Sequence, residues 1–204
     1  MFANRRNGAS GDDVRERLAG ILMLREGAAR LLLGILAGLP SVGTCDQIYR
    51  NALWRYEVSF PESWTQDSST PEGVAYRSWS DAPHDMNMLT CNTHAALSES
   101  TVTMSQDQVN AKHLATRDEA RAFVEKQIGS VSETFVWDIG HAKAIGFVNE
   151  GSVSADKQVF PFTSISITLY RPGIVYNVTC GAPRSRFSAV RPTLERVLRS
   201  TRLP

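Results

Sequence analysis

Alternation of hydrophobic and polar residues predicts that most of the chain folds into β-strands. The clearest case is Val159–Tyr170, in which Ile165, Ile167 and Leu169 alternate with serine and threonine. Side chains of a strand point alternately to its two faces, so one face of this strand is expected to pack in a core while the other is polar. The same criterion, with turn residues as boundaries, predicts further strands at Tyr56–Phe60, Val74–Trp79, Met86–Thr93, Glu133–Ile139, Lys143–Asn149 and Ile174–Cys180. The turns expected between the last four strands are Gly140–His141, Gly151–Asp156 and Arg171–Gly173.

Two segments have the spacing of an amphipathic helix. The first begins at Thr116, because Thr116 and Glu119 have the spacing of a capping box, and it ends at Gly129. The second lies at the C-terminus and contains Pro192. Since proline has no backbone N–H, we expect Pro192 in the first turn, so that this helix begins near Ala189.

The predicted order of elements is three strands, a helix, four strands and a helix. A shorter helix or an irregular segment over Gln106–His113 is expected to precede the first of these helices. Strands that follow one another in hairpins form an antiparallel sheet, and isolated helices then cover it. The sequence therefore predicts one α+β domain over residues 44–204, with an antiparallel β-sheet flanked by helices.

An apolar run near the N-terminus has the features of an export signal. Leu31–Leu39 follows arginines, precedes small residues, and is shorter than the ~20 residues that a helix needs to cross a bilayer. Cleavage after Gly43 would remove residues 1–43, so we expect a periplasmic or secreted protein. Met1–Leu22 is polar and far from the apolar run, which suggests an extension before a true start at Met23.

Two alternatives remain open for the leader. Val42–Cys45 resembles the lipobox of bacterial lipoproteins, whose cysteine is acylated, although Thr44 stands where that box has Gly, Ala or Ser. Peripheral membrane association is expected only if Cys45 is lipidated in this way. In the second alternative the protein is cytosolic, and Asp12–Leu39 forms an amphipathic helix.

Charge and cysteine content narrow the partner classes. The chain has 22 Lys and Arg against 21 Asp and Glu, a net charge of +1, which gives no reason to expect a nucleic acid partner.

In an oxidising compartment we expect a disulfide between Cys91 and Cys180, because each follows a threonine inside a predicted strand. Such a bridge closes a long loop and stabilises a fold by about 3 to 5 kcal/mol. In a cytosolic protein the two would be buried free thiols.

Several segments resemble the Mog/PsbP-like superfamily. The first segment is Tyr56–Trp64, which is a predicted strand that ends in Phe-Pro-x-x-Trp. The second is the central capped helix, and the third is Tyr176–Cys180, which leads through Phe187 into the last helix. The resemblance covers most of Tyr56–Leu203 and implies an α/β/α sandwich around an antiparallel sheet. Members of the superfamily include a Ran-binding nuclear protein, the extrinsic photosystem II subunit and bacterial envelope proteins. The resemblance thus implies a binding or assembly role and transfers no catalytic residue.

Two groups of residues carry candidate chemistry. His84, Met86 and Met88 would share one face of a strand, and imidazole with thioether ligands suits Cu(I), so these three are a candidate metal site. The alternative is that the methionines fill the core. No nucleophile motif occurs, so an enzyme site would have to form in three dimensions, around His84, Asp85 and His141.

The C-terminal segment is locally basic and is the candidate partner-binding surface. Its candidate residues are Arg184, Arg186, Arg196 and Arg202. Local positive charge can steer an acidic partner or anionic lipid headgroups toward a surface. Together these observations predict an exported, non-enzymatic envelope protein that binds a protein partner or a small ligand and uses no cofactor. A periplasmic enzyme and a copper-handling protein are the alternatives.

Overall fold

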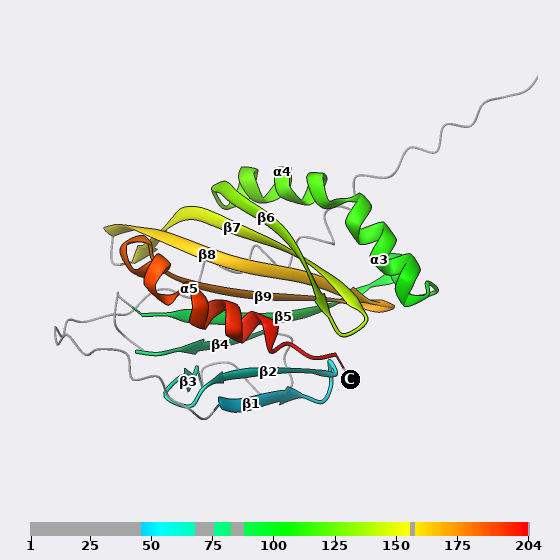
Figure 1. Ribbon diagram of the computed structural model, residues 1–204, viewed down its shortest axis with the longest axis horizontal. Helices are drawn as coiled ribbons and strands as arrows, with labels where there is room; N and C mark the ends of the chain where they lie inside the picture. The colour runs from blue at the N-terminus through cyan, green and yellow to red at the C-terminus, as the bar shows by residue number, and fades with distance from the viewer. Residues whose placement is uncertain (1–45, 68–75, 83–87, 156–157, 204) are drawn as a thin grey trace, which may run out of the picture.

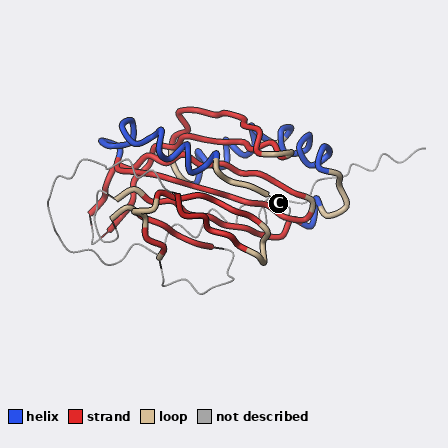
Figure 2. Tube along the Cα trace, turned by 60° about the horizontal axis from the view of Figure 1, so that its bottom comes forward, coloured by secondary structure: helices blue, strands red, loops and turns tan. Residues whose placement is uncertain are grey.

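Seven strands form one antiparallel sheet in the computed structural model, which describes residues 46–67, 76–82, 88–155 and 158–203. The order across this sheet is β3-β4-β5-β9-β8-β7-β6, and the strands run along the length of the molecule (Figures 1 and 2). Their bounds are β3 (Thr65–Gln66), β4 (Tyr76–Ser80), β5 (Thr90–Ser98), β6 (Ser130–Ile139), β7 (Ala142–Ala155), β8 (Gln158–Arg171) and β9 (Gly173–Pro183).

Two further strands precede this sheet in the chain and form a hairpin of their own. These strands are β1 (Asp46–Asn51) and β2 (Tyr56–Pro61), which pair antiparallel. The sequence predicted β2 but not β1. Because Tyr49 and Asn51 point inward while Asp46, Ile48 and Arg50 are exposed, β1 alternates over too few residues to stand out from the leader that precedes it.

Helices lie on both sides of the seven-stranded sheet. The C-terminal helix α5 (Arg184–Arg199) packs in front of β8 and β9 in Figure 1, whereas α3 (Gln106–Ala115) and α4 (Arg117–Gln127) contact β6, β7 and β8. A short 3-10 helix, η2 (Glu99–Thr101), links β5 to the region before α3. The predicted fold class is thereby confirmed: an antiparallel β-sheet flanked by helices. None of the helices in the described ranges is long and apolar enough to cross a membrane.

The main hydrophobic core lies between the sheet, α5 and the β1–β2 hairpin. Aromatic rings join the hairpin to the sheet: Phe60 stacks on Trp79 with ring centroids 4.1 Å apart, and Tyr49 meets the edge of Trp79 at 4.8 Å. Such pairs add about 0.5 to 1.5 kcal/mol each beyond the area they bury. Fully buried aliphatic residues of β8 and α5 complete this core, namely Ile165, Ile167, Leu169, Leu194 and Leu198. A smaller cluster under α4 consists of Val124, Val131, Ile145 and Phe147.

The helix capping box lies one helix earlier than predicted. Ser105 Oγ accepts the backbone N–H of Gln108 at 3.3 Å, and Gln108 Oε1 accepts the Ser105 N–H at 2.8 Å, so the box begins α3. The box predicted for Thr116 and Glu119 is wrong. Because α4 follows α3 directly, Thr116 also ends α3, and its hydroxyl donates to the His113 carbonyl at 3.0 Å instead of capping α4.

The C-terminal helix begins earlier than predicted. It starts at Arg184 rather than near Ala189, and Pro192 lies inside it. Pro192 cannot donate a hydrogen bond to the Ser188 carbonyl, but both residues are exposed, so water can bind that carbonyl. Burial of Phe187 in the core anchors the turns before the proline.

Strand boundaries also differ from the prediction at two places. The segment Gly151–Asp156, predicted as a turn, is mostly strand, because β7 continues to Ala155 in register with β8. The strand predicted at Met86–Thr93 begins later, at Thr90, and continues to Ser98. The helix after Gln106 is confirmed as α3, and the four strands from β6 to β9 occur in the predicted order.

Candidate binding surface

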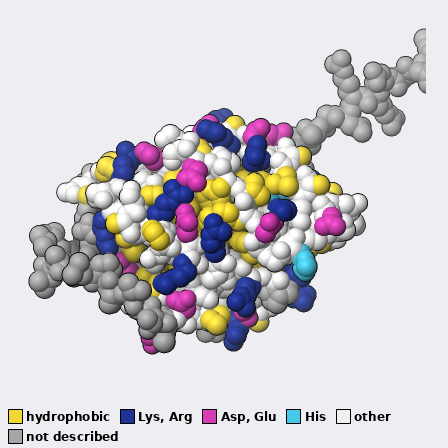
Figure 3. Space-filling model, viewed as in Figure 1, with side chains coloured by type: hydrophobic (Ala, Val, Ile, Leu, Met, Phe, Trp, Pro, Cys, Tyr) yellow, Lys and Arg dark blue, Asp and Glu magenta, His cyan; other side chains and the backbone are white. Residues whose placement is uncertain are grey.

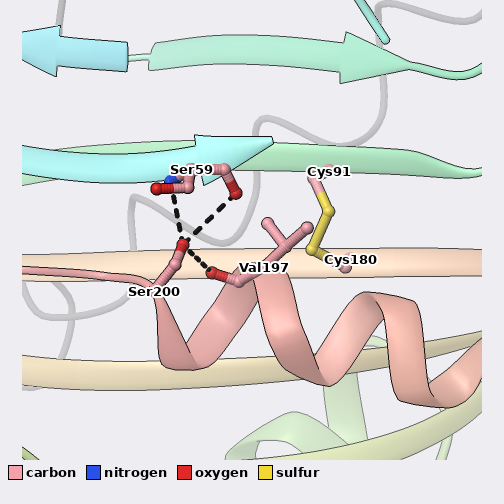
Figure 4. Close-up of a disulfide and its surroundings, with 5 residues drawn as sticks. All are labelled: Ser59, Cys91, Cys180, Val197 and Ser200. Atoms are coloured by element: carbon pink, nitrogen blue, oxygen red, sulfur yellow. Dashed lines mark hydrogen bonds between the residues drawn. A yellow bond between two sulfur atoms is a disulfide. The ribbon is translucent and has the colours of Figure 1, made fainter. Parts of the chain in front are cut away.

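Cys91 and Cys180 form the disulfide that the sequence predicted (Figure 4). They are directly opposite each other on β5 and β9, and both side chains are fully buried on the side of the sheet that α5 covers. The bridge therefore belongs to the main core and offers no thiol to solvent.

Four of the other predicted site residues lie outside the described ranges. They are Cys45, His84, Asp85 and Met86, and the apolar run Leu31–Leu39 lies outside them too. Met88 is half-buried just before β5, and His141 is exposed in the turn between β6 and β7. Within the described ranges, no group of three or more His, Cys, Asp or Glu side chains has the geometry to hold a metal ion.

The C-terminal arginines make ion pairs within the chain. Arg184 lies 3.5 Å from Glu150, and Arg196 lies 3.9 Å from Asp46. Further pairs are Arg186 with Asp81, Arg191 with Glu133, and Arg191 with Glu195. Figure 3 shows the result on the side that carries α5, where basic and acidic side chains are interspersed. A docking role for Arg184, Arg186, Arg196 and Arg202 stays a prediction, on a surface where opposite charges partly cancel.

A different surface emerges from the register of the sheet. Residues directly opposite each other on neighbouring antiparallel strands point to the same face. Cys91, Val178 and Ile167 therefore share the face that α5 covers, and the residues that alternate with them share the other face. In the middle of β4, β5, β9 and β8 the side chains of this second face are serine, threonine, asparagine and His94. Apolar and aromatic residues lie on the same face toward the strand ends, namely Ala96, Phe160, Phe162, Tyr170 and Val175.

We call this second face the polar face. Its rows follow the pairing: Ser78, Asn92, Thr179 and Ser166 form one row, and His94, Asn177 and Thr168 form the next. A third row contains Ser80, Thr90 and Ser164. All of these side chains are partly exposed.

The helices on this side of the sheet lie at its other end. The principal contacts of α4 are with β6 and β7, and those of α3 are with β7 and β8. Contact of α3 with the polar face is confined to its border, where His113 hydrogen-bonds the Thr168 carbonyl at 2.9 Å and meets the Tyr170 ring edge-on. The helices thus shield the apolar cluster Val124, Val131, Ile145 and Phe147, while the rows from β4 to β8 consist of polar side chains.

The polar face carries no formal charge. None of the residues that β4, β5, β8 and β9 place on it in the described ranges is Asp, Glu, Lys or Arg. His94 is the titratable member, and burial lowers its pKa, which favours the neutral imidazole at neutral pH. Its Nδ1 atom is buried without a hydrogen-bond partner in the structure. Thr168 Oγ1 donates to Asn177 Oδ1 at 2.6 Å, which links two neighbouring strands across the face.

Sequence reasoning identified only one strand of this surface. The alternation in Val159–Tyr170 assigned Ser164, Ser166, Thr168 and Tyr170 to a mostly polar face, and the structure confirms it. The contribution of β5 was missed, because the strand predicted at Met86–Thr93 stops before His94, whereas β5 continues to Ser98. Strand order was the missing information, since residues on β4, β5, β8 and β9 become neighbours only through pairings distant in sequence.

Comparison with solved structures supports the fold and names no site. The solution structure of PsbP from the cyanobacterium Synechocystis sp. PCC 6803 aligns with a TM-score of 0.52 at 13% identity, covering 84% of this chain and 99% of that one. LpqN, involved in cell envelope biogenesis of Mycobacterium tuberculosis, aligns with a TM-score of 0.50 at 12% identity, covering 78% of this chain and 91% of that one. No protein-family model and no curated protein matches the sequence. The chain thus has the Mog/PsbP-like fold.

Proposed function

We propose that this chain is an exported, non-enzymatic envelope protein that binds its partner through the polar face. The observation that carries the proposal is the difference between the two faces of one sheet. One face is closed by α5 and the β1–β2 hairpin. The other face presents partly exposed polar side chains on the strands away from the main contacts of α3 and α4. These polar groups lie outside the core, in cross-strand rows on rigid strands, so an external ligand can reach them.

Chemistry on the polar face supports binding rather than catalysis. General acid–base and nucleophilic mechanisms need a titratable or activated group held by a second group that orients it. His94 lies on this face opposite Asn177, and no carboxylate or thiol accompanies it at the described positions of β4, β5, β8 and β9. Hydroxyls and amides on rigid strands are suited to hydrogen-bonding a ligand in a fixed orientation.

Envelope localisation draws on independent support. The leader has the features of a signal peptide, and the Cys91–Cys180 disulfide suits an oxidising compartment. LpqN, which shares the fold, is involved in cell envelope biogenesis. Fractionation of the native host with intact-mass measurement tests this part of the proposal. We expect a chain that begins at Thr44, or at an acylated Cys45, outside the cytoplasm, and full-length protein in the cytosol would overturn export.

Sedimentation with the host envelope tests the binding surface. Ser166→Arg places an unpaired charge in the middle row, and Ser188→Arg makes the same change on the exposed side of α5. Burying an uncompensated charge in an interface is expected to weaken binding at least about tenfold. Only the first variant should lose binding. Equal binding of both variants would exclude the polar face.

The same assay separates this surface from the C-terminal arginines. Arg202 is exposed, so Arg202→Ala removes one candidate docking charge. Binding through the arginines would weaken in this variant and with added salt, because exposed charges are screened at high ionic strength. Binding through the polar face should be insensitive to both.

A further inference from the structure

We infer that the ligand of the polar face is a neutral glycan, an oligosaccharide or polysaccharide chain held by hydrogen bonds to side chains of β4, β5, β9 and β8. This inference rests on the proposed function, because it names the ligand class of the same surface. It follows from the charge, the side-chain types and the size of that surface.

Charge complementarity argues for a neutral ligand. The overall chain is 21% charged residues, yet the described positions of this face on four strands include none. Nucleic acids and anionic lipid headgroups are bound mainly through Lys and Arg, and a cationic ligand requires carboxylates. A surface that has neither basic side chains nor carboxylates is expected to bind a ligand that carries no net charge.

Side-chain types on the polar face distinguish a glycan from a protein or a small apolar molecule. Binding energy in protein interfaces is concentrated in Trp, Tyr and Arg, whereas Ser and Thr are under-represented among the residues that contribute most. Small apolar ligands bind in concave, mostly hydrophobic sites. Each hydroxyl on this face both donates and accepts, and an amide whose oxygen is already bonded, as in Asn177, offers its NH2 group as a donor. Sugar hydroxyls have the same dual character.

The dimensions suit a ligand of several sugar units. Neighbouring strands are ~4.8 Å apart, and residues two apart on one face of a strand are ~6.8 Å apart. Rows that span β4, β5, β9 and β8 therefore cover about 14 Å in each direction. That area is too large for a monosaccharide to fill.

An aromatic ring lies at the end of this array. Phe162 is partly exposed on β8, and its ring covers Gly181 of β9 so closely that a Cβ atom on Gly181 would lie 2.3 Å from it. A side chain at this position would therefore displace the Phe162 ring, and glycine leaves room for it. Aromatic side chains combine a large apolar surface with defined geometry, and they can stack on the C–H face of a sugar ring.

The class of ligand can be tested without knowing its identity. Host envelope is divided into three samples, one oxidised with periodate, which cleaves the vicinal diols of glycans, one digested with proteinase K, and one untreated. We expect the mature chain to sediment with the untreated and the protease-treated samples and to lose binding to the oxidised one. Loss of binding after protease, with retention after periodate, would overturn the glycan and identify a protein partner. Loss of binding on raising the salt from about 50 to 500 mM would instead identify a charged ligand.

A matched pair of variants links this result to the polar face. Asn177→Asp replaces the amide by an acceptor of the same shape, and Gln127→Glu makes the equivalent change at the exposed end of α4. Loss of one hydrogen bond is expected to weaken envelope binding about 2- to 10-fold in Asn177→Asp and to leave Gln127→Glu unchanged. If Ser166→Arg fails to weaken binding, the proposed function fails. If Ser166→Arg weakens binding but oxidation of the envelope with periodate does not, only the glycan inference fails.

Discussion

The two faces of the β5–β9 strand pair differ in almost every property. On one face Cys91 and Cys180 are joined and fully buried beneath α5, and on the other Asn92 and Thr179 are partly exposed. These residues are neighbours in sequence and belong to the same two strands. The difference teaches that side-chain alternation separates the positions that hold the strands in the core from the positions that face solvent, and only the second set belongs to the proposed binding surface.

The core face is also held at its rim by the end of the chain. Ser200 Oγ accepts the Ser59 N–H at 2.8 Å and donates to the Val197 carbonyl, as Figure 4 shows. Backbone hydrogen bonds between Glu57 and Arg202, each 2.9 Å long, extend this contact along β2. The N-terminal hairpin is thereby attached to the C-terminal segment, and β2 has a hydrogen-bonded neighbour on both edges.

Removal of the disulfide should have the largest effect. The bridge closes a loop with a sequence separation of 89, for which loss of the chain-entropy contribution predicts destabilisation by about 4 to 5 kcal/mol. The change is the double variant Cys91→Ala with Cys180→Ala, and urea unfolding measures it. The control is Ser166→Ala with Thr179→Ala, a directly opposed pair on the polar face, which should cost less than about 1 kcal/mol. Equal costs would show that both faces stabilise the fold.

Truncation of a core leucine should have the next largest effect. Leu194 on α5 is fully buried against the sheet, so Leu194→Ala removes buried methyl groups and leaves a cavity. We expect a loss of about 2 to 4 kcal/mol in the free energy of unfolding. Ser166→Ala on the polar face should change it by no more than about 0.5 kcal/mol. A large loss in Ser166→Ala would mean that the middle row of the polar face is part of the folded core.

Loss of the hairpin contact should be smaller. Ser200→Ala removes the hydroxyl that accepts the Ser59 N–H, and we expect a cost of about 1 to 2 kcal/mol. Ser188→Ala, at an exposed position of the same helix, is the control and should be nearly neutral. Chemical denaturation of both variants measures the difference. If Ser200→Ala is as neutral as its control, the attachment of the hairpin to the C-terminal segment depends on the backbone bonds alone.

The sequence predicted those features of the two faces that depend only on residues close together in the chain. Alternation in Val159–Tyr170 predicted both the buried and the polar residues of β8, because side-chain direction in a strand follows from position alone. The Cys91–Cys180 pairing was predicted from compartment and strand context and is confirmed. Order of elements, rather than any one motif, also predicted the Mog/PsbP-like fold.

Features that depend on tertiary contacts were not predictable in this way. Thr116 has the spacing of a capping box, but α3 and α4 share it, and the hydroxyl serves the end of α3. Pro192 is tolerated inside α5 because burial of Phe187 and neighbouring residues outweighs one lost hydrogen bond on the exposed side. The polar face itself depends on the strand order, which brings β8 and β5 to either side of β9.

The smallest expected effect concerns pH and the neutrality of the polar face. Burial lowers the pKa of His94 below its ordinary value of about 6.5, whereas the unfolded chain keeps that ordinary value. From about one pH unit above 6.5 the imidazole is essentially neutral in both states, so it contributes no pH dependence to stability there. Below that pH the unfolded chain binds a proton that the folded protein resists, so the free energy of unfolding falls as the pH falls toward the folded-state pKa.

His94→Gln isolates this contribution. Unfolding free energies measured by denaturant between about pH 5 and pH 8 should fall less steeply on acidification in His94→Gln than in the wild type. The cross-strand partners of His94 are Asn177 and Tyr76, so no carboxylate is paired opposite it to stabilise the protonated ring. An unchanged slope in His94→Gln would mean that water reaches the imidazole in solution. The polar face would then be neutral at neutral pH and would gain a positive charge in acid, when His94 is protonated. That outcome would sharpen the contrast with the core face, whose buried residues nearest to the disulfide do not titrate in this range.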